Sequence, residues 1–212
     1  MLDISEIFYS IQGESTFAGL PCIFIRLAGC NLNCRYCDTR YSLETQSRLA
    51  AADILSQIKK YFPVKLVEIT GGEPLLQTEV YALINLLYEE GYKILLETNG
   101  SINLANIPLF VHKIVDVKCP GSGCEDSFNK KNLALINKSS DEIKFVISSK
   151  LDYQWAKVFI KNNKLSTYQI LFSAVTEKVS LKKLAEWILK DKIKARLQPQ
   201  IHKFIWPGEE RR

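Results

Sequence analysis

The stretch VKLVEITGGEPLLQTEVYALINLLYEEGYKILLETNG, residues 64–100, decides the expected fold. An apolar strand pattern at 64–70 is followed by an amphipathic helix pattern at 78–90 and a second apolar strand pattern at 92–97. A helix between two continuous apolar strands is typical of parallel strands that are joined across one face of a sheet. This unit therefore predicts an α/β fold.

The same alternation extends over the rest of the chain. Continuous apolar strands separated by helices predict a mostly parallel sheet with outer helices. A closed barrel of eight such units usually needs ~250 residues, so we expect a partial, open β/α barrel that forms a single domain over residues 1–212. The further strands are expected at 3–9, 22–27, 113–118, 143–148, 168–173 and 195–198, and the further helices at 51–62, 129–137, 152–162 and 180–191.

Length and composition favour a cytoplasmic protein. The 212 residues are 47% hydrophobic, yet no apolar run approaches the ~18 residues that span a bilayer, and the N-terminus has no export pattern. Lys and Arg number 28 against 23 Asp and Glu, and much of this excess falls within 182–196. A solvated helix face explains that basic run better than a nucleic-acid site does. We therefore expect no membrane contact and no direct nucleic-acid contact.

Polar and glycine-rich segments follow the ends of the expected strands. Cys30 comes after the strand at 22–27, Gly72 comes after 64–70, and the segment 97–100 (ETNG) closes the strand at 92–97. In parallel sheets the ligand site lies at the carboxyl ends of the strands. These segments are therefore expected to meet around one site.

The stretch GCNLNCRYCDT, residues 29–39, contains Cys30, Cys34 and Cys37 on one short loop. Disulfides are disfavoured because the chain is long, apolar and apparently not exported. A structural zinc site needs four ligands, and an electron-transfer iron–sulfur cluster usually has four thiolates. Three thiolates on a four-iron cluster would leave one iron open to a small molecule. A non-catalytic zinc or iron–sulfur module stays open as an alternative.

The cysteine spacing, the aromatic residue before the last cysteine and the GGEP segment at 71–74 together resemble the radical S-adenosylmethionine superfamily. In that superfamily the methionine moiety chelates the open iron, and one electron from the cluster cleaves the sulfonium to a 5′-deoxyadenosyl radical. The resemblance implies a catalytic [4Fe–4S] cluster held by Cys30, Cys34 and Cys37. It also implies S-adenosylmethionine contacts from Tyr36, Cys37, Asp38, Gly72, Glu73, Asp116, Val117, Lys118, Ser173, Ala174, Val175 and Thr176.

The segment EIFYSIQGESTFAGLPCIFIRLAGCNLNCRYCDT, residues 6–39, closely resembles the 7-carboxy-7-deazaguanine synthase family of queuosine and other 7-deazapurine biosynthesis. Further matches lie at 115–123 and 197–207, so the resemblance runs from end to end. The family's lyase reaction, which supplies a tRNA modification pathway, converts 6-carboxy-5,6,7,8-tetrahydropterin to 7-carboxy-7-deazaguanine with loss of ammonia. The resemblance also implies a homodimer and an electron donor such as flavodoxin or ferredoxin.

The resemblance implies that the N-terminal segment 8–14 and the C-terminal tail 198–207 bind the pterin. The Gln12 amide offers a donor and an acceptor, the Glu14 carboxylate can accept N–H groups, and the Arg26 fork suits a carboxylate. Without the family context, ordinary loop and strand contacts would explain these three residues. The implied substrate-binding residues are Ile11, Gln12, Gly13, Glu14, Arg26, Thr70, His202 and Pro207.

Thr39 follows the last cysteine of the loop by two positions. It could cap a helix that follows the loop. In the family the matching threonine is the sole protein ligand of Mg²⁺, an ion that accepts few protein ligands when water and substrate oxygens complete its octahedron. The resemblance therefore implies that the cluster loop, residues 29–40, holds both the cluster and Mg²⁺.

A second hypothesis within the superfamily is an activase that makes a glycyl radical on a partner protein. Such an enzyme would share the cysteine triplet but lack the segments YSIQGES, 9–15, and IHKFIWP, 201–207. The sequence assigns no role to Cys22, Cys119 and Cys124.

Overall fold

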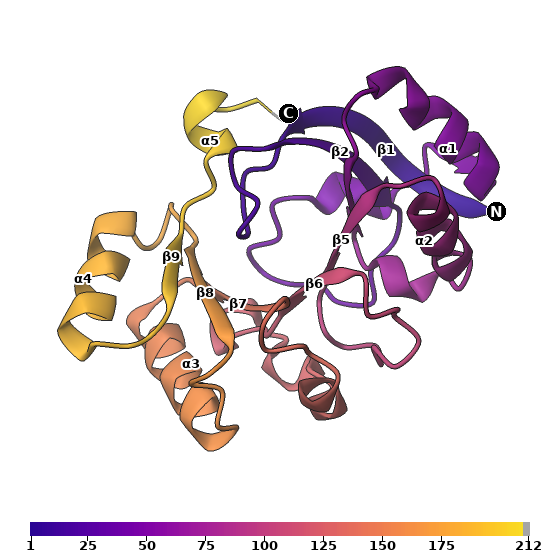
Figure 1. The fold of residues 1–212 in the computed structure, drawn as a ribbon. Helices are drawn as coiled ribbons and strands as arrows, with labels where there is room; N and C mark the ends of the chain where they lie inside the picture. The colour runs from indigo at the N-terminus through magenta and orange to yellow at the C-terminus, as the bar shows by residue number, and fades with distance from the viewer. Residues whose placement is uncertain (210–212) are drawn as a thin grey trace.

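One open sheet organises residues 1–209, which are those that the computed structural model describes (Figure 1). Its strands run in the order β3-β1-β2-β4-β5-β6-β7-β8-β9, and neighbours from β2 to β9 are parallel. β1 pairs antiparallel with β2 and β3. The strands are β1 (Leu2–Ile11), β2 (Pro21–Leu27), β3 (Ser47–Leu49), β4 (Leu66–Gly71), β5 (Lys93–Thr98), β6 (His112–Asp116), β7 (Glu142–Ile147), β8 (Gln169–Ala174) and β9 (Arg196–Gln198).

The edge strands β3 and β9 do not pair with each other, so the barrel stays open. The prediction of a partial β/α barrel of mostly parallel strands is therefore confirmed. The last three residues of the expected domain 1–212 lie outside the described residues.

All helices except the short α5 (His202–Ile205) cover the outer face of the curved sheet. In Figure 1, α1 and α2 lie on the side of β1 and β2, whereas α3 and α4 lie on the side of β7 to β9. α2 shows why: Val80, Leu83, Ile84 and Leu87 recur at helical spacing and are all fully buried. Within the described chain no helix has the length and apolar character needed to cross a bilayer. The helices are α1 (Ala51–Ile58), α2 (Val80–Glu89), α3 (Lys150–Asn162), α4 (Leu181–Asp191) and α5 (His202–Ile205).

The helix expected at 129–137 is wrong, because the structure has only a short 3-10 helix there, Lys130–Ala134. Asn132 is fully buried, and its side chain binds the backbone of another loop. The Asn132 amide donates to the carbonyl oxygens of Gly100 and Ile102, and its Oδ1 accepts the Leu104 N–H. These hydrogen bonds hold the segment against the loop 100–104, so the Asn132 side chain stabilises this contact instead of a regular helix. The sequence patterns also missed β3 and α5.

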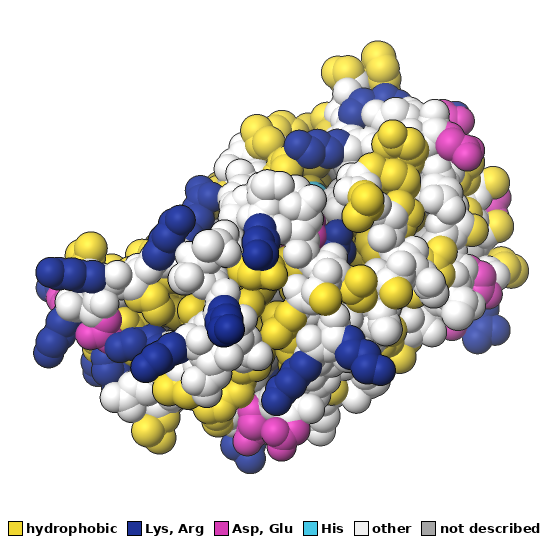
Figure 2. All heavy atoms as spheres, turned by 60° about the horizontal axis from the view of Figure 1, so that its bottom comes forward, with side chains coloured by type: hydrophobic (Ala, Val, Ile, Leu, Met, Phe, Trp, Pro, Cys, Tyr) yellow, Lys and Arg dark blue, Asp and Glu magenta, His cyan; other side chains and the backbone are white. Residues whose placement is uncertain are grey.

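Basic side chains are spread out on the face that Figure 2 shows. Figure 2 shows Lys and Arg side chains scattered among apolar and uncharged atoms over the face at the bottom of Figure 1. The basic residues of 182–196 are all exposed, in agreement with a solvated helix face.

The inside of the barrel has an apolar floor and a polar upper part. Phe24, Leu66, Leu95 and Ile114 pack together on the inner face, with Phe17 against them. The connection between β1 and β2 closes the amino ends of the strands, because the Thr16 N–H donates to Glu142 at the start of β7. The barrel is therefore open to ligands at the carboxyl ends of the strands.

Candidate active site

A cavity of about 290 Å³ opens at the carboxyl ends of the parallel strands. Its wall comes from the cluster loop, the segment after β1, the ends of β4 to β8 and the C-terminal tail. Segments far apart in the sequence meet here because parallel strands end at one edge of the sheet. The expected site residues that line the cavity are Ile11, Gln12, Gly13, Glu14, Arg26, Cys30, Cys34, Tyr36, Cys37, Asp38, Thr39, Thr70, Gly72, Asp116, Lys118, Ser173, Ala174, Val175 and His202.

Four expected site residues do not line this cavity. Glu73 and Val117 are fully buried behind its wall, whereas Thr176 and Pro207 are exposed to solvent. Val117 packs in the outer core, and its N–H donates to the Lys144 carbonyl oxygen at 2.8 Å. These four side chains therefore do not form part of the cavity wall.

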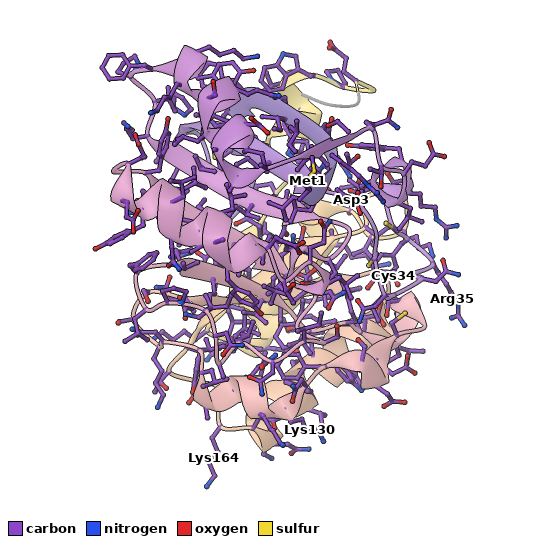
Figure 3. The ribbon with its side chains drawn as sticks, turned by 90° about the vertical axis from the view of Figure 1, so that its right-hand side faces the viewer. Met1, Asp3, Cys34, Arg35, Lys130 and Lys164 are labelled. Carbon is purple, nitrogen blue, oxygen red and sulfur yellow. The ribbon has the colours of Figure 1, made fainter. Side chains whose placement is uncertain are left out.

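The cluster loop carries its three thiols along one side of the cavity. All three belong to free cysteines, and N–H groups already point at one sulfur: Leu32 N lies 3.4 Å from Cys30 Sγ, and Asn99 Nδ2 lies 3.8 Å from it. Such donors favour thiolate ligands of an iron–sulfur cluster. The loop lies at the edge of the molecule, with Arg35 pointing outward (Figure 3). The donor set therefore fits a cluster that faces the cavity and lies near the surface.

The remaining cysteines have distinct positions. Cys22 and Cys119 are fully buried, the first in the barrel floor and the second in the outer core. Cys124 lies beside Cys34, because its loop is held by the Arg35 N–H donating to the Ser122 carbonyl oxygen at 2.9 Å. Burial raises the pKa of the Cys34 thiol to about 12, an effect that Lys118 opposes and Cys124 reinforces. Without iron this thiol is therefore protonated near neutral pH.

The GGEP turn, residues 71–74, packs against the start of the cluster loop at Gly29. A Cβ on Gly72 would lie 2.1 Å from the Gly29 carbonyl oxygen, so only glycine allows this approach of the two backbones. The Glu73 carboxylate accepts N–H groups from Leu75 and Asn99 and the Thr98 hydroxyl at 2.7 to 3.0 Å. Burial raises the pKa of Glu73, and these hydrogen bonds act in the opposite direction. Glu73 thus ties the turn after β4 to the turn after β5.

Two further contacts shape the wall near the cluster loop. Lys118 Nζ lies 2.5 Å from Asp116 Oδ2, and both side chains are nearly buried. The Tyr36 hydroxyl donates to the Val146 carbonyl oxygen at 3.3 Å, which fixes the ring across the cavity end of β7. The backbone of Ser173 to Val175 continues this wall at the end of β8.

The Thr39 hydroxyl does not act as a helix cap. Thr39 precedes the short 3-10 helix Arg40–Leu43, but its side chain makes no capping hydrogen bond. Its Oγ1 lies 3.8 Å from Cys37 Sγ and faces the cavity. Next to it, Asp38 Oδ2 lies 3.1 Å from Lys203 Nζ, which joins the cluster loop to the tail.

The C-terminal tail packs on the segment after β1. The Ile201 N–H donates to the Gly13 carbonyl oxygen at 3.0 Å, and Gln200 Nε2 lies 2.7 Å from Glu14 Oε1. A Cβ on Gly13 would lie 1.9 Å from His202 Nδ1, so the imidazole occupies the space that any other side chain at position 13 would need. Burial lowers the pKa of His202, so the imidazole is neutral near pH 7.

A network of charges inside the barrel was not predicted. Lys144 Nζ lies 2.7 Å from Glu14 Oε2 and 2.6 Å from Glu97 Oε1, while the Thr70 hydroxyl lies 3.3 Å from Glu97 Oε2. Glu68 lies two residues before Thr70 in β4, closer to the apolar floor, and accepts a hydrogen bond from Gln12. The available signal was a single charged residue inside an otherwise apolar strand, as in LVEIT at 66–70 and IKFVI at 143–147.

Arg26 is also held by a carboxylate. Its Nε donates to Glu6 Oε1 at 2.7 Å, and the Tyr41 hydroxyl donates to the same oxygen at 3.0 Å. The guanidinium carbon lies 6.0 Å from the centroid of the Phe8 ring. One edge of the guanidinium is thus fixed, and the side chain lines the cavity.

Comparison with known proteins gives a consistent result. The model of the radical SAM superfamily matches residues 24–117. The chain is similar to the 7-carboxy-7-deazaguanine synthase of Koribacter versatilis, with 44% identity over 98% of each chain. It is also similar to that of Chlorobaculum tepidum, with 43% identity over 99% of this chain and 96% of the relative. Among solved structures, QueE from Escherichia coli has a TM-score of 0.73 at 22% identity and covers 93% of this chain and 94% of its own, a likeness of fold.

Proposed function

Because the chain belongs to the 7-carboxy-7-deazaguanine synthase family of radical S-adenosylmethionine enzymes, we propose that it converts 6-carboxy-5,6,7,8-tetrahydropterin to 7-carboxy-7-deazaguanine with loss of ammonia. The observation that carries this proposal is one cavity lined by both the three-thiol loop and Arg26, Glu14 and His202. When bound, the cluster and S-adenosylmethionine supply a 5′-deoxyadenosyl radical for hydrogen abstraction.

Cys30, Cys34 and Cys37 hold the cluster in this proposal, and their free thiols along the cavity support it. Their loop supplies no fourth cysteine, which leaves one iron for the cofactor. Glu73 acts as a positioning residue, because its carboxylate is fully buried and bound by neighbouring turns. The proposed cofactor contacts that line the cavity are Tyr36, Asp38, Gly72, Asp116, Lys118, Ser173, Ala174 and Val175, with Val117 and Thr176 as their neighbours.

Arg26 binds the substrate carboxylate in this proposal. Its Nε is held by Glu6, which orients the planar fork, and its side chain lines the cavity. Ile11, Gln12, Gly13 and Glu14 line the same cavity from the segment after β1. Thr70 and His202 complete the lining of the proposed substrate site. Pro207 stays a proposed substrate contact, although it is exposed and does not line the cavity.

Thr39 is the proposed protein ligand of Mg²⁺. Thr39 lines the cavity, and its hydroxyl makes no helix-capping bond. Its contact with Cys37 Sγ at 3.8 Å is long, so a hard cation in the cavity can compete for this oxygen. A bound Mg²⁺ would draw electron density toward the substrate carboxylate and help orient the substrate.

The further partners are proposals as well. The exposed position of Cys37 and of Arg35 supports approach of an electron donor such as flavodoxin or ferredoxin to the cluster loop. We also propose a homodimer, which light scattering would test. A cytoplasmic location suits thiol ligands, because they require reducing conditions.

An anaerobic assay tests the proposed function. The reconstituted protein is given a reductant, S-adenosylmethionine, Mg²⁺ and the carboxy-tetrahydropterin, and formation of 7-carboxy-7-deazaguanine is expected. Broad absorbance near ~400 nm that disappears in Cys30→Ala, Cys34→Ala and Cys37→Ala would accompany a cluster. A colourless folded protein with stoichiometric zinc would support the non-catalytic module instead, and a fully reconstituted protein that forms no product would refute the assignment.

A further inference from the structure

Glu68 is a buried carboxylate that faces the substrate side of the barrel. It lies in the middle of β4, between Leu66 of the apolar floor and Thr70 at the rim, and these three residues share the inner face of the strand. Its side chain lines the cavity, although the residue is only 5% exposed. One oxygen, Oε2, accepts a hydrogen bond from Gln12 Nε2. Within residues 1–209 the other oxygen, Oε1, has no hydrogen-bonding partner.

The polar groups next to Glu68 are more fully engaged. Gln12 uses its Nε2 on Glu68 and its Oε1 on the Glu14 N–H at 3.0 Å. Glu14 has Lys144 at one carboxylate oxygen and Gln200 at the other. Gln12 and Glu14, which were expected to bind the pterin edge, therefore already have partners within the protein. Glu68, in contrast, lines the cavity and still has an acceptor oxygen without a partner.

The charges around Glu68 favour a ligand that brings N–H donors. Three carboxylates, those of Glu14, Glu68 and Glu97, lie around the cation Lys144. Arg26, which is already held by Glu6, also acts on Glu97. Burial and the charge of Glu97 raise the pKa of Glu68 to about 8. Near pH 7 Glu68 therefore holds a proton when no ligand is bound, and a ligand edge with N–H donors would stabilise its ionised form.

We propose that Glu68 is a specificity-determining residue that accepts the adjacent N–H groups of the pyrimidine ring of the pterin. This inference rests on the proposed function. The 2-amino and N3–H groups of a pterin lie side by side, as two N–H groups of a guanidinium do, and one ionised carboxylate can accept both. Oε1 would accept one of them, and Oε2 would accept the other with the lone pair that Gln12 does not use. Arg26 would then bind the carboxylate at the opposite end of the substrate.

Two ligands that differ at one ring position test the proposal. 6-Carboxypterin carries a 2-amino group, and 6-carboxylumazine carries a 2-oxo group in its place. Both keep the carboxylate that Arg26 would bind. Their dissociation constants are measured with the anaerobic, cluster-loaded protein in the presence of S-adenosylmethionine. The wild type should bind the pterin at least about tenfold more tightly, since the oxo group places an acceptor against a carboxylate.

Glu68→Gln replaces one acceptor oxygen by an NH₂ donor at nearly constant volume. The preference for the pterin over the lumazine should fall by about tenfold or more. Glu142→Gln is the matched control, because it changes a fully buried carboxylate that contacts Thr16 at the closed end of the barrel. Its preference should equal that of the wild type. If Glu68→Gln does not fold, Glu68→Asp retracts the carboxylate by one methylene and should also reduce the preference.

The outcomes separate this inference from the proposed function. A wild type that binds neither ligand contradicts the proposed function. A wild type that binds both equally overturns the role of Glu68. So does a preference that Glu68→Gln leaves unchanged while both affinities fall together, because Glu68 would then only orient Gln12.

Discussion

For Thr39 the structure removes one of two explanations, the helix cap, and the metal ligand stays a proposal. Its hydroxyl faces the cavity and does not cap the helix that follows. Thr39→Ala should therefore lower activity by at least about tenfold and change its dependence on Mg²⁺, because an ion ligand is lost. Iron content and cluster absorbance should stay at the wild-type level. Thr39→Ser keeps the hydroxyl and should retain most activity, whereas loss of iron in Thr39→Ala would show a structural role.

Substitution of Cys124 tests whether the three thiolates of the cluster loop are enough to hold the iron–sulfur cluster. It lies beside Cys34 but belongs to the loop after β6, outside the cysteine triplet. Cys124→Ser should keep the full iron content per chain after reconstitution and bind S-adenosylmethionine as the wild type does. Cys34→Ser should lose most of its iron. An equal loss of iron in both variants would mean that Cys124 is a fourth ligand and that the open-iron assignment is wrong.

At the scale of elements, the contact between the segment after β1 and the tail is tight enough to predict a coupling. Gly13→Ala would place a Cβ 1.9 Å from His202 Nδ1 and displace the tail from the cavity. We expect KM for the pterin to rise by about tenfold, with cluster content unchanged. In a His202→Ala background the same change should cost less than about threefold, because the opposing ring is gone. Equal effects in both backgrounds would place the cause elsewhere.

Elements formed by local periodicity were predictable, and elements formed by distant side chains were not. The apolar positions of α2 repeat every three to four residues, so its helix is visible in the sequence. The segment 129–137 has a similar pattern, but the buried amide of Asn132 binds a loop about 30 residues away in sequence. No pattern within the segment reveals that partner.

The candidate site divides in the same way. The cluster loop and the GGEP turn were found because their spacing reflects one local piece of chemistry. Lys144 was missed because its role depends on Glu14 in the segment after β1 and on Glu97 in β5, both distant in the sequence. The close approach of Gly72 to Gly29 likewise joins two turns, although the glycine itself was noticed.

At the scale of the whole molecule, the carboxylates inside the barrel should lower stability as the pH rises. The pKa of Glu68 is about 8 in the folded protein against its usual 4.5, chiefly because of burial. The folded state therefore holds this proton more tightly than the unfolded state does. Its favourable contribution is complete below pH 4.5 and is lost as the pH rises to about 8. Glu97 and Glu73 are shifted in the same direction by burial.

Glu68→Gln isolates this contribution. The free energy of unfolding of the cluster-free protein is measured with urea under reducing conditions at pH 5 and pH 8. Relative to the wild type, the variant should gain about 3 kcal/mol between these two pH values, because glutamine has no proton to lose. Leu66→Val, in the same strand, alters packing without changing a titrating group, so its effect should be the same at both. A pH-independent difference for Glu68→Gln would contradict the assigned shift. A gain in stability together with a loss of pterin preference would show that this carboxylate is retained for binding at a cost to the fold.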